Sequence, residues 1–123
     1  MLKIELPQNE RSFAPGATIG VDAHWALDKP ADRVELRLVW NTVGKGDRDL
    51  SVVSTWSYDA TSMNGHQLEE VTLPEAPYSF SGKLLSLVWA FELIALPSGE
   101  STREEFVIAP NGRELTLHKS EIV

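Results

Sequence analysis

The sequence predicts an all-β fold, an antiparallel two-sheet sandwich of about seven to eight strands. About eight short segments alternate apolar and polar residues, which is the period of a β-strand. Turn-forming Gly, Pro, Asn and Asp residues separate these segments. No segment of ten or more residues keeps the i, i+3, i+4, i+7 apolar spacing of an amphipathic helix. These observations favour two packed sheets with Greek-key connections.

The longest alternation predicts the central strand. It repeats an apolar side chain at every second position, at Leu85, Leu87, Trp89, Phe91, Leu93 and Ala95. The preceding segment contains Pro74, Pro77 and Gly82, which exclude regular structure. We therefore expect a corner that leads into this strand.

Two strands are expected before residue 30. The first runs from Leu2 to Leu6 and is stopped by a proline. A polar loop then ends at Pro15–Gly16, which suits a tight turn with Gly at positive φ. The second strand, Ile19 to Leu27, is expected to point its apolar residues inward and Asp22 and His24 outward.

The next two strands form a predicted hairpin with a charged tip at residues 44–48. The inward residues of its first strand are Val34, Leu36, Leu38 and Trp40, with Val39 as an apolar exception on the solvent face. The inward residues of its second strand are Leu50, Val52, Ser54, Trp56 and Tyr58.

The remaining elements are shorter. A loop is expected from Asp59 to Gln67, because Asn64–Gly65 is the strongest turn signal in the chain. A strand to Leu73 follows, and a seventh strand carries Phe106 and Ile108. Last come a tight turn at Asn111–Gly112 and an eighth strand through Leu115 and Leu117.

Composition limits the classes of protein. With 123 residues and 42% hydrophobic residues, the chain is expected to be a single domain over residues 1–123 with its own core. It has no cysteine, so disulfides and thiolate zinc sites are excluded. The net charge of -7 argues against nucleic acid, which needs a basic surface. No signal peptide and no membrane-inserted segment are expected, so a cytoplasmic location is the expectation.

The sequence predicts no enzyme, no metal and no cofactor. The three histidines, His24, His66 and His118, show no spacing typical of metal ligands. Asp22 and His24 share one strand face, which we interpret as a solvated pair. A nucleophile motif of the G-x-S-x-G type and an EF-hand loop are both absent.

Aromatic side chains offer an alternative function. Trp56, Tyr58 and Tyr78 lie near predicted loop ends, where exposed rings could stack on sugars. A carbohydrate-binding module is therefore the second hypothesis. A small hydrolase or metal enzyme is a distant third.

Three segments resemble arrestin-like domains. FAPGATIGVDAHW resembles their Pro-Gly turn and opening strand, and LPEAPYSFSGKLLSLVWAFELIA is similar to their corner and long apolar strand. EFVIAP resembles their closing strand, and the pieces occur in the right order. The resemblance to this family, including its retromer-subunit branch, implies an arrestin-like or immunoglobulin-like sandwich and a non-catalytic adaptor role. Arrestin-like proteins usually pair two sandwiches, and this chain has room for one. The basic phosphate-sensing residues and buried polar core of arrestins also have no evident equivalent in this acidic chain, so no binding residue is carried over.

We expect the partner to be another protein, bound at an exposed strand edge or at loops. The residues expected at this site come from the two loops of residues 43–49 and 59–67. They are Val43, Lys45, Asp47, Arg48, Met63, Asn64 and His66. An open strand edge also allows a homodimer.

Overall fold

The computed structural model describes residues 1–44, 49–81, 85–110 and 115–116. Within these ranges the chain forms ten strands and one short 3-10 turn, η1 (Pro7–Asn9). The strands are β1 (Leu2–Glu5), β2 (Ser12–Phe13), β3 (Thr18–Ala26), β4 (Arg33–Gly44), β5 (Leu50–Asp59), β6 (Asn64–Thr72), β7 (Phe80–Ser81), β8 (Leu85–Leu96), β9 (Ser101–Ile108) and β10 (Leu115–Thr116). The predicted turn at Asn111–Gly112 and residue Leu117 lie outside the described residues.

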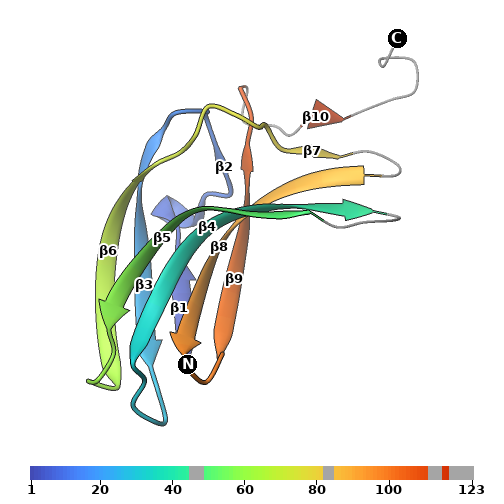
Figure 1. Cartoon of the computed structure of the whole chain (residues 1–123). Helices are drawn as coiled ribbons and strands as arrows, with labels where there is room; N and C mark the ends of the chain where they lie inside the picture. The colour runs from blue at the N-terminus through green and yellow to red at the C-terminus, as the bar shows by residue number, and fades with distance from the viewer. Residues whose placement is uncertain (45–48, 82–84, 111–114, 117–123) are drawn as a thin grey trace.

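The strands form two facing sheets (Figure 1). The smaller sheet has the antiparallel order β1-β3-β6. The larger sheet has the order β10-β7-β8-β4-β5, and β9 pairs with β8. The chain leaves the smaller sheet after β3, forms the β4–β5 hairpin in the larger sheet, and returns as β6 beside β3. This is a Greek-key connection, so the predicted all-β sandwich is confirmed.

Two two-residue strands, β2 and β7, go beyond the eight predicted strands, and β10 coincides with the start of the predicted eighth. β2 and β10 make short parallel pairs with β9 and β7, whereas all the long pairs are antiparallel. The polar loop before Gly16 contains η1 and β2. Gly16 takes the expected positive φ, +75°, at the Pro-Gly turn.

The central strand is confirmed as β8. It pairs with β4, β7 and β9, and its inward residues from Leu87 to Ala95 are buried. The Trp89 indole donates a hydrogen bond of 2.9 Å to the Pro77 carbonyl, which attaches the Pro-rich corner to this strand. The apolar alternation therefore identified the centre of the core.

The prediction for the first half of β5 was wrong. Leu50 and Val52 were expected inward, but 63% and 49% of their surfaces are exposed. A β-bulge is the cause: Leu38 lies opposite Ser54, and Val39 lies opposite Val52, so Val53 has no partner. One extra residue moves every preceding side chain to the other face of the sheet.

The loop prediction around Asn64–Gly65 was also wrong, because both residues belong to β6. Gly65 lies directly opposite Trp25 on β3. A Cβ atom at Gly65 would lie 2.1 Å from the Trp25 Cζ2 atom. Glycine is required here because the indole approaches the backbone closely. In the sequence alone, the same glycine after an asparagine indicates a turn, which explains the wrong prediction.

Candidate functional site

An apolar surface lies at the β4–β5 end of the larger sheet. It consists of Val43, Leu50, Val52 and Val53, each at least 41% exposed, and is called the β5 surface below. The bulge places Leu50 and Val52 on the outer face, opposite Asn41 and Val39. Leu50 and Val52 belong to this surface because the bulge moves them from the inner to the outer face of the sheet.

β5 is also an edge strand. Among the described residues it pairs with β4 and with no other strand, so one side of its backbone faces away from the sheet. Its sequence contains neither lysine nor proline, which often protect edges from further pairing. An extended segment of a second chain can therefore add to this edge through main-chain hydrogen bonds.

Charged side chains on the rest of this outer face are paired. The Glu35 carboxylate accepts hydrogen bonds from Arg33 Nε at 2.8 Å and from Arg37 Nη2 at 2.7 Å. These hydrogen bonds, first from Arg33 and then from Arg37, lower the pKa of the Glu35 carboxyl below its ordinary value of 4.5. The paired charges leave the β5 surface as the apolar part of this face.

Arg103 makes a second group of ion pairs on the same face. Its guanidinium binds Glu92 at 3.0 Å and Glu105 at 3.2 Å, and it donates to the Asn41 side chain on β4. Arg103 thus spans β8.

Val39, which was expected on the solvent face, is fully buried on this side of the sheet, so that prediction was wrong.

The residues predicted to bind a partner do not form one site. Val43 lies in the β5 surface, whereas Met63, Asn64 and His66 lie beyond the other end of β5. The ten residues of β5 separate the two groups. Lys45, Asp47 and Arg48 lie outside the described residues.

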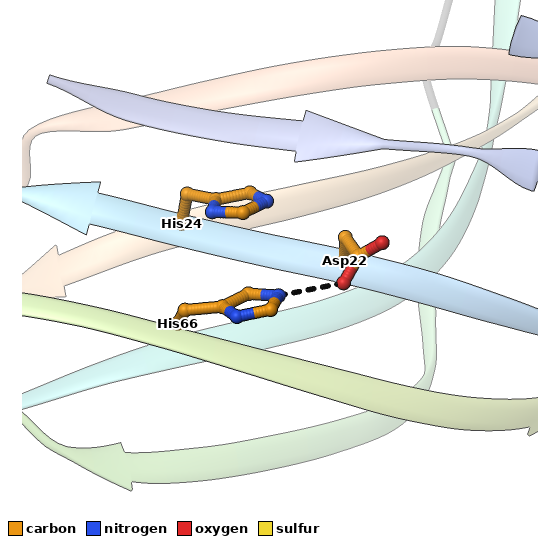
Figure 2. A group of neighbouring side chains, drawn as sticks. All are labelled: Asp22, His24 and His66. Atoms are coloured by element: carbon orange, nitrogen blue, oxygen red, sulfur yellow. Dashed lines mark hydrogen bonds and ion pairs between the residues drawn. The ribbon is translucent and has the colours of Figure 1, made fainter.

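A second group of polar side chains lies on the outer face of the smaller sheet (Figure 2). His66 is in β6, directly opposite His24 on β3. The two imidazole rings stack with their centroids 4.2 Å apart and their planes at 3°. His66 Nε2 lies 2.7 Å from Asp22 Oδ1, and Asp22 shares the outer face of β3 with His24. Asp22, His24 and His66 are called the histidine cluster below.

The expectation that the histidines do not converge was therefore wrong for His24 and His66. Sequence analysis placed His66 in a loop, because Asn64–Gly65 favours a turn. The separation of Asp22 and His24 by two positions was a correct signal for one half of the cluster. The position of His66 depends on the register between β3 and β6, which pairs His24 with this residue 42 positions later in the chain.

The aromatic side chains offer little surface for sugar stacking. Trp25 and Tyr58 stack with centroids 5.8 Å apart, but Trp25 is buried. Trp56 packs against the core, and the Tyr58 hydroxyl donates to Glu69 at 2.8 Å. Tyr78 is exposed. The described residues therefore show no exposed, coplanar pair of Trp or Tyr rings.

Two further polar regions are the buried Ser79 and a hollow between two turns. Ser79 is buried, and its hydroxyl accepts a hydrogen bond of 3.0 Å from the Ile108 amide. A hollow lies between the turns at residues 27–31 and 97–100, and the ionisable groups of its lining are Asp28, Lys29 and Glu100. No helix in the described part of the chain is long and apolar enough to cross a membrane.

Comparison with solved structures finds a protein of similar fold. The crystal structure of Spo0M, a sporulation control protein from Bacillus subtilis, superposes on 87% of this chain with a TM-score of 0.59 and 16% sequence identity. Spo0M is an arrestin-like protein. This chain has an arrestin-like fold. The chain spans about half of the Spo0M structure, 48%. Neither a family model nor a curated protein sequence matches the chain.

Proposed function

We propose that the chain is a non-catalytic adaptor module that binds an extended segment of another protein at β5. The observation that carries this proposal is the edge strand itself: ten residues, one open side, and the apolar β5 surface beside it. A partner strand would gain affinity from main-chain hydrogen bonds and specificity from apolar side chains that contact the β5 surface.

The arrestin-like fold supports a regulatory or adaptor role rather than catalysis. Isolated exposed apolar residues are common on folded proteins, but neighbouring ones on one face indicate an interaction site. The partner segment is expected to alternate apolar and polar residues, since it would present one face to Leu50 and Val52.

The test is an affinity capture from native cell extract with three forms of the chain. In one variant Leu50→Lys and Val52→Lys make the β5 surface charged. In the matched control Leu68→Lys changes a leucine of nearly equal exposure, 62% against 63%, on the edge strand β6. The proposal predicts a partner that the wild type and the control retain and the double variant loses.

Hydrogen exchange then locates the contact. Binding should slow amide exchange in β5 and leave β6 unchanged, because strand addition satisfies the open side of β5. Equal retention by all three forms, or protection confined to β6, would contradict the proposal. Analytical ultracentrifugation of the pure chain separates this outcome from a homodimer: a dimer lost in the double variant would assign the edge to self-association instead.

A further inference from the structure

We infer that the histidine cluster is a binding site for a divalent transition-metal ion of the zinc class. Asp22, His24 and His66 each offer one ligand atom, and these atoms lie within 4.8 Å of one another. Two imidazole nitrogens and a carboxylate oxygen form a donor set typical of zinc and related ions. The site is separate from the β5 edge and does not depend on the proposed adaptor function.

The backbone supplies most of the geometry. Asp22 and His24 lie two positions apart on β3, and His66 lies opposite His24 on β6. Figure 2 shows both rings on the same side of the sheet, beside Asp22. Neighbouring, paired strands thus hold all three side chains in place, and a rigid scaffold of this kind lowers the entropy lost on binding.

Metal binding requires a small movement of the rings. Ligand atoms around a tetrahedral zinc ion lie roughly 3.3 Å apart, since each lies about 2.0 to 2.1 Å from the ion. The two rings lie in nearly parallel planes, so their in-plane lone pairs do not converge on one point. Rotation about the side-chain bonds must tilt the rings toward each other. The hydrogen bond from His66 to Asp22 would then be replaced by two bonds to the ion.

The surroundings allow this movement. About half of the His66 side chain and about a third of the His24 and Asp22 side chains are exposed to solvent, which leaves room on the outer side for the rings to tilt. An ion bound to three protein ligands would keep a fourth position for water.

Glu5 is the supporting residue. It lies opposite Asp22 on β1, and its carboxylate is 3.8 Å from His24 Nε2 and 3.0 Å from the Lys3 ammonium. Because Lys3 already pairs with Glu5, we assign Glu5 to the surroundings of the site rather than to the ion. Its negative charge favours a bound cation.

The test is isothermal titration of the untagged full chain with zinc chloride. We expect one ion per chain. His24→Ala and His66→Ala should each weaken binding by more than the roughly 10- to 100-fold that loss of a supporting residue costs at metal sites. His118→Ala is the matched control, because it removes the one other histidine of the chain and should leave the affinity unchanged. With no cysteine present, thiolate ligands cannot contribute.

One further variant and one spectroscopic titration extend this test. Asp22→Asn keeps the size of the side chain and its hydrogen bond to His66, and it should weaken zinc binding. Cobalt titration should give the visible absorption of a four- or five-coordinate ion in the wild type and not in His66→Ala. Circular dichroism checks that each variant is folded.

The inference is overturned if zinc binds wild type and His66→Ala equally, or if His118→Ala removes the binding. It is also overturned if the wild type binds no zinc at millimolar concentration. None of these results would affect the adaptor proposal, which rests on β5 variants that leave Asp22, His24 and His66 unchanged.

Discussion

The outer faces of the two sheets organise charge in opposite ways. On the larger sheet each described ion-pair group contains both signs: Glu35 binds two arginines, and Arg103 binds two glutamates. On the smaller sheet the histidine cluster gathers a carboxylate and two imidazoles, with Glu5 and Lys3 beside it. The first arrangement is complete without a ligand. The second brings three possible metal-ligand atoms within 4.8 Å of one another.

The comparison suggests a division of roles. On the larger sheet Glu35 and Arg103 lie in ion pairs, and exposed apolar residues lie along β5. The histidine cluster links β3 to the edge strand β6, so an ion bound there would stabilise the smaller sheet. The predictions below change one sheet at a time.

The largest expected effect is on the inner side of the smaller sheet. Gly65→Ala places a methyl group 2.1 Å from the indole of Trp25, which is buried and stacked on Tyr58. We expect the free energy of unfolding in urea to fall by about 3 kcal/mol, because overpacking a closed core forces β6 away from β3. The same shift would separate His66 from His24.

Gly20→Ala is the control for this change. Gly20 lies on β3 of the same sheet, and its nearest neighbour is the exposed Leu68 side chain at 3.3 Å, which can move. We expect a change of about 0.5 kcal/mol or less. Equal losses in both variants would show that Trp25 does not hold the register of β6.

On the larger sheet, Glu35→Gln should reduce stability at pH 7 by about 1 to 2 kcal/mol, because it removes charge-assisted hydrogen bonds. The pKa of Glu35 is lowered in the folded chain, so its contribution is present above pH 4.5 and is lost as the pH falls below that value. The difference between the wild type and Glu35→Gln should therefore shrink in urea titrations at pH 3. A difference that is constant with pH would contradict this assignment.

Glu105→Gln is the comparison within the same face. The Glu105 side chain is 62% exposed and makes a single 3.2 Å contact with Arg103. Exposed ion pairs contribute little, so we expect a loss below about 0.5 kcal/mol. The contrast with Glu35 measures the effect of burial on a charge pair.

A smaller effect than that at Glu35 concerns a hydrogen bond between the two sheets. Tyr58→Phe removes the hydrogen bond from β5 to Glu69 on β6 and should cost about 1 kcal/mol. Burial, and then the hydrogen bond to Glu69, raise the pKa of the Tyr58 phenol above its ordinary value of 10. Its contribution is therefore complete below pH 10 and is lost as the pH rises further. Alkaline unfolding that is identical in the wild type and Tyr58→Phe would refute this.

Much of the fold could be predicted from the sequence. Strict alternation identified the inward faces of β3 and β8, where residues such as Val21 and Trp89 are fully buried. Alternation depends on the backbone of one strand alone, and it is therefore a local property of the sequence.

Alternation could not predict which face of the sheet the first half of β5 turns outward, and it could not predict the candidate sites. Leu50 and Val52 alternate correctly, yet a bulge opposite Leu38 and Val39 turns them outward. The bulge depends on how two strands match, which alternation does not contain. The candidate edge at β5 was foreseen only in general terms, as an exposed strand edge.

The sequence by itself determined the all-β class, the central strand and the buried faces of β3 and β8, because hydrophobic burial follows a period of two along a regular strand. Only the tertiary structure decided which side chains meet across strands. His24 and His66 share one register position although 42 residues separate them, and Gly65 is a strand residue because Trp25 packs against it. Register results from the packing of whole strands, and therefore both candidate sites became visible only in the folded chain.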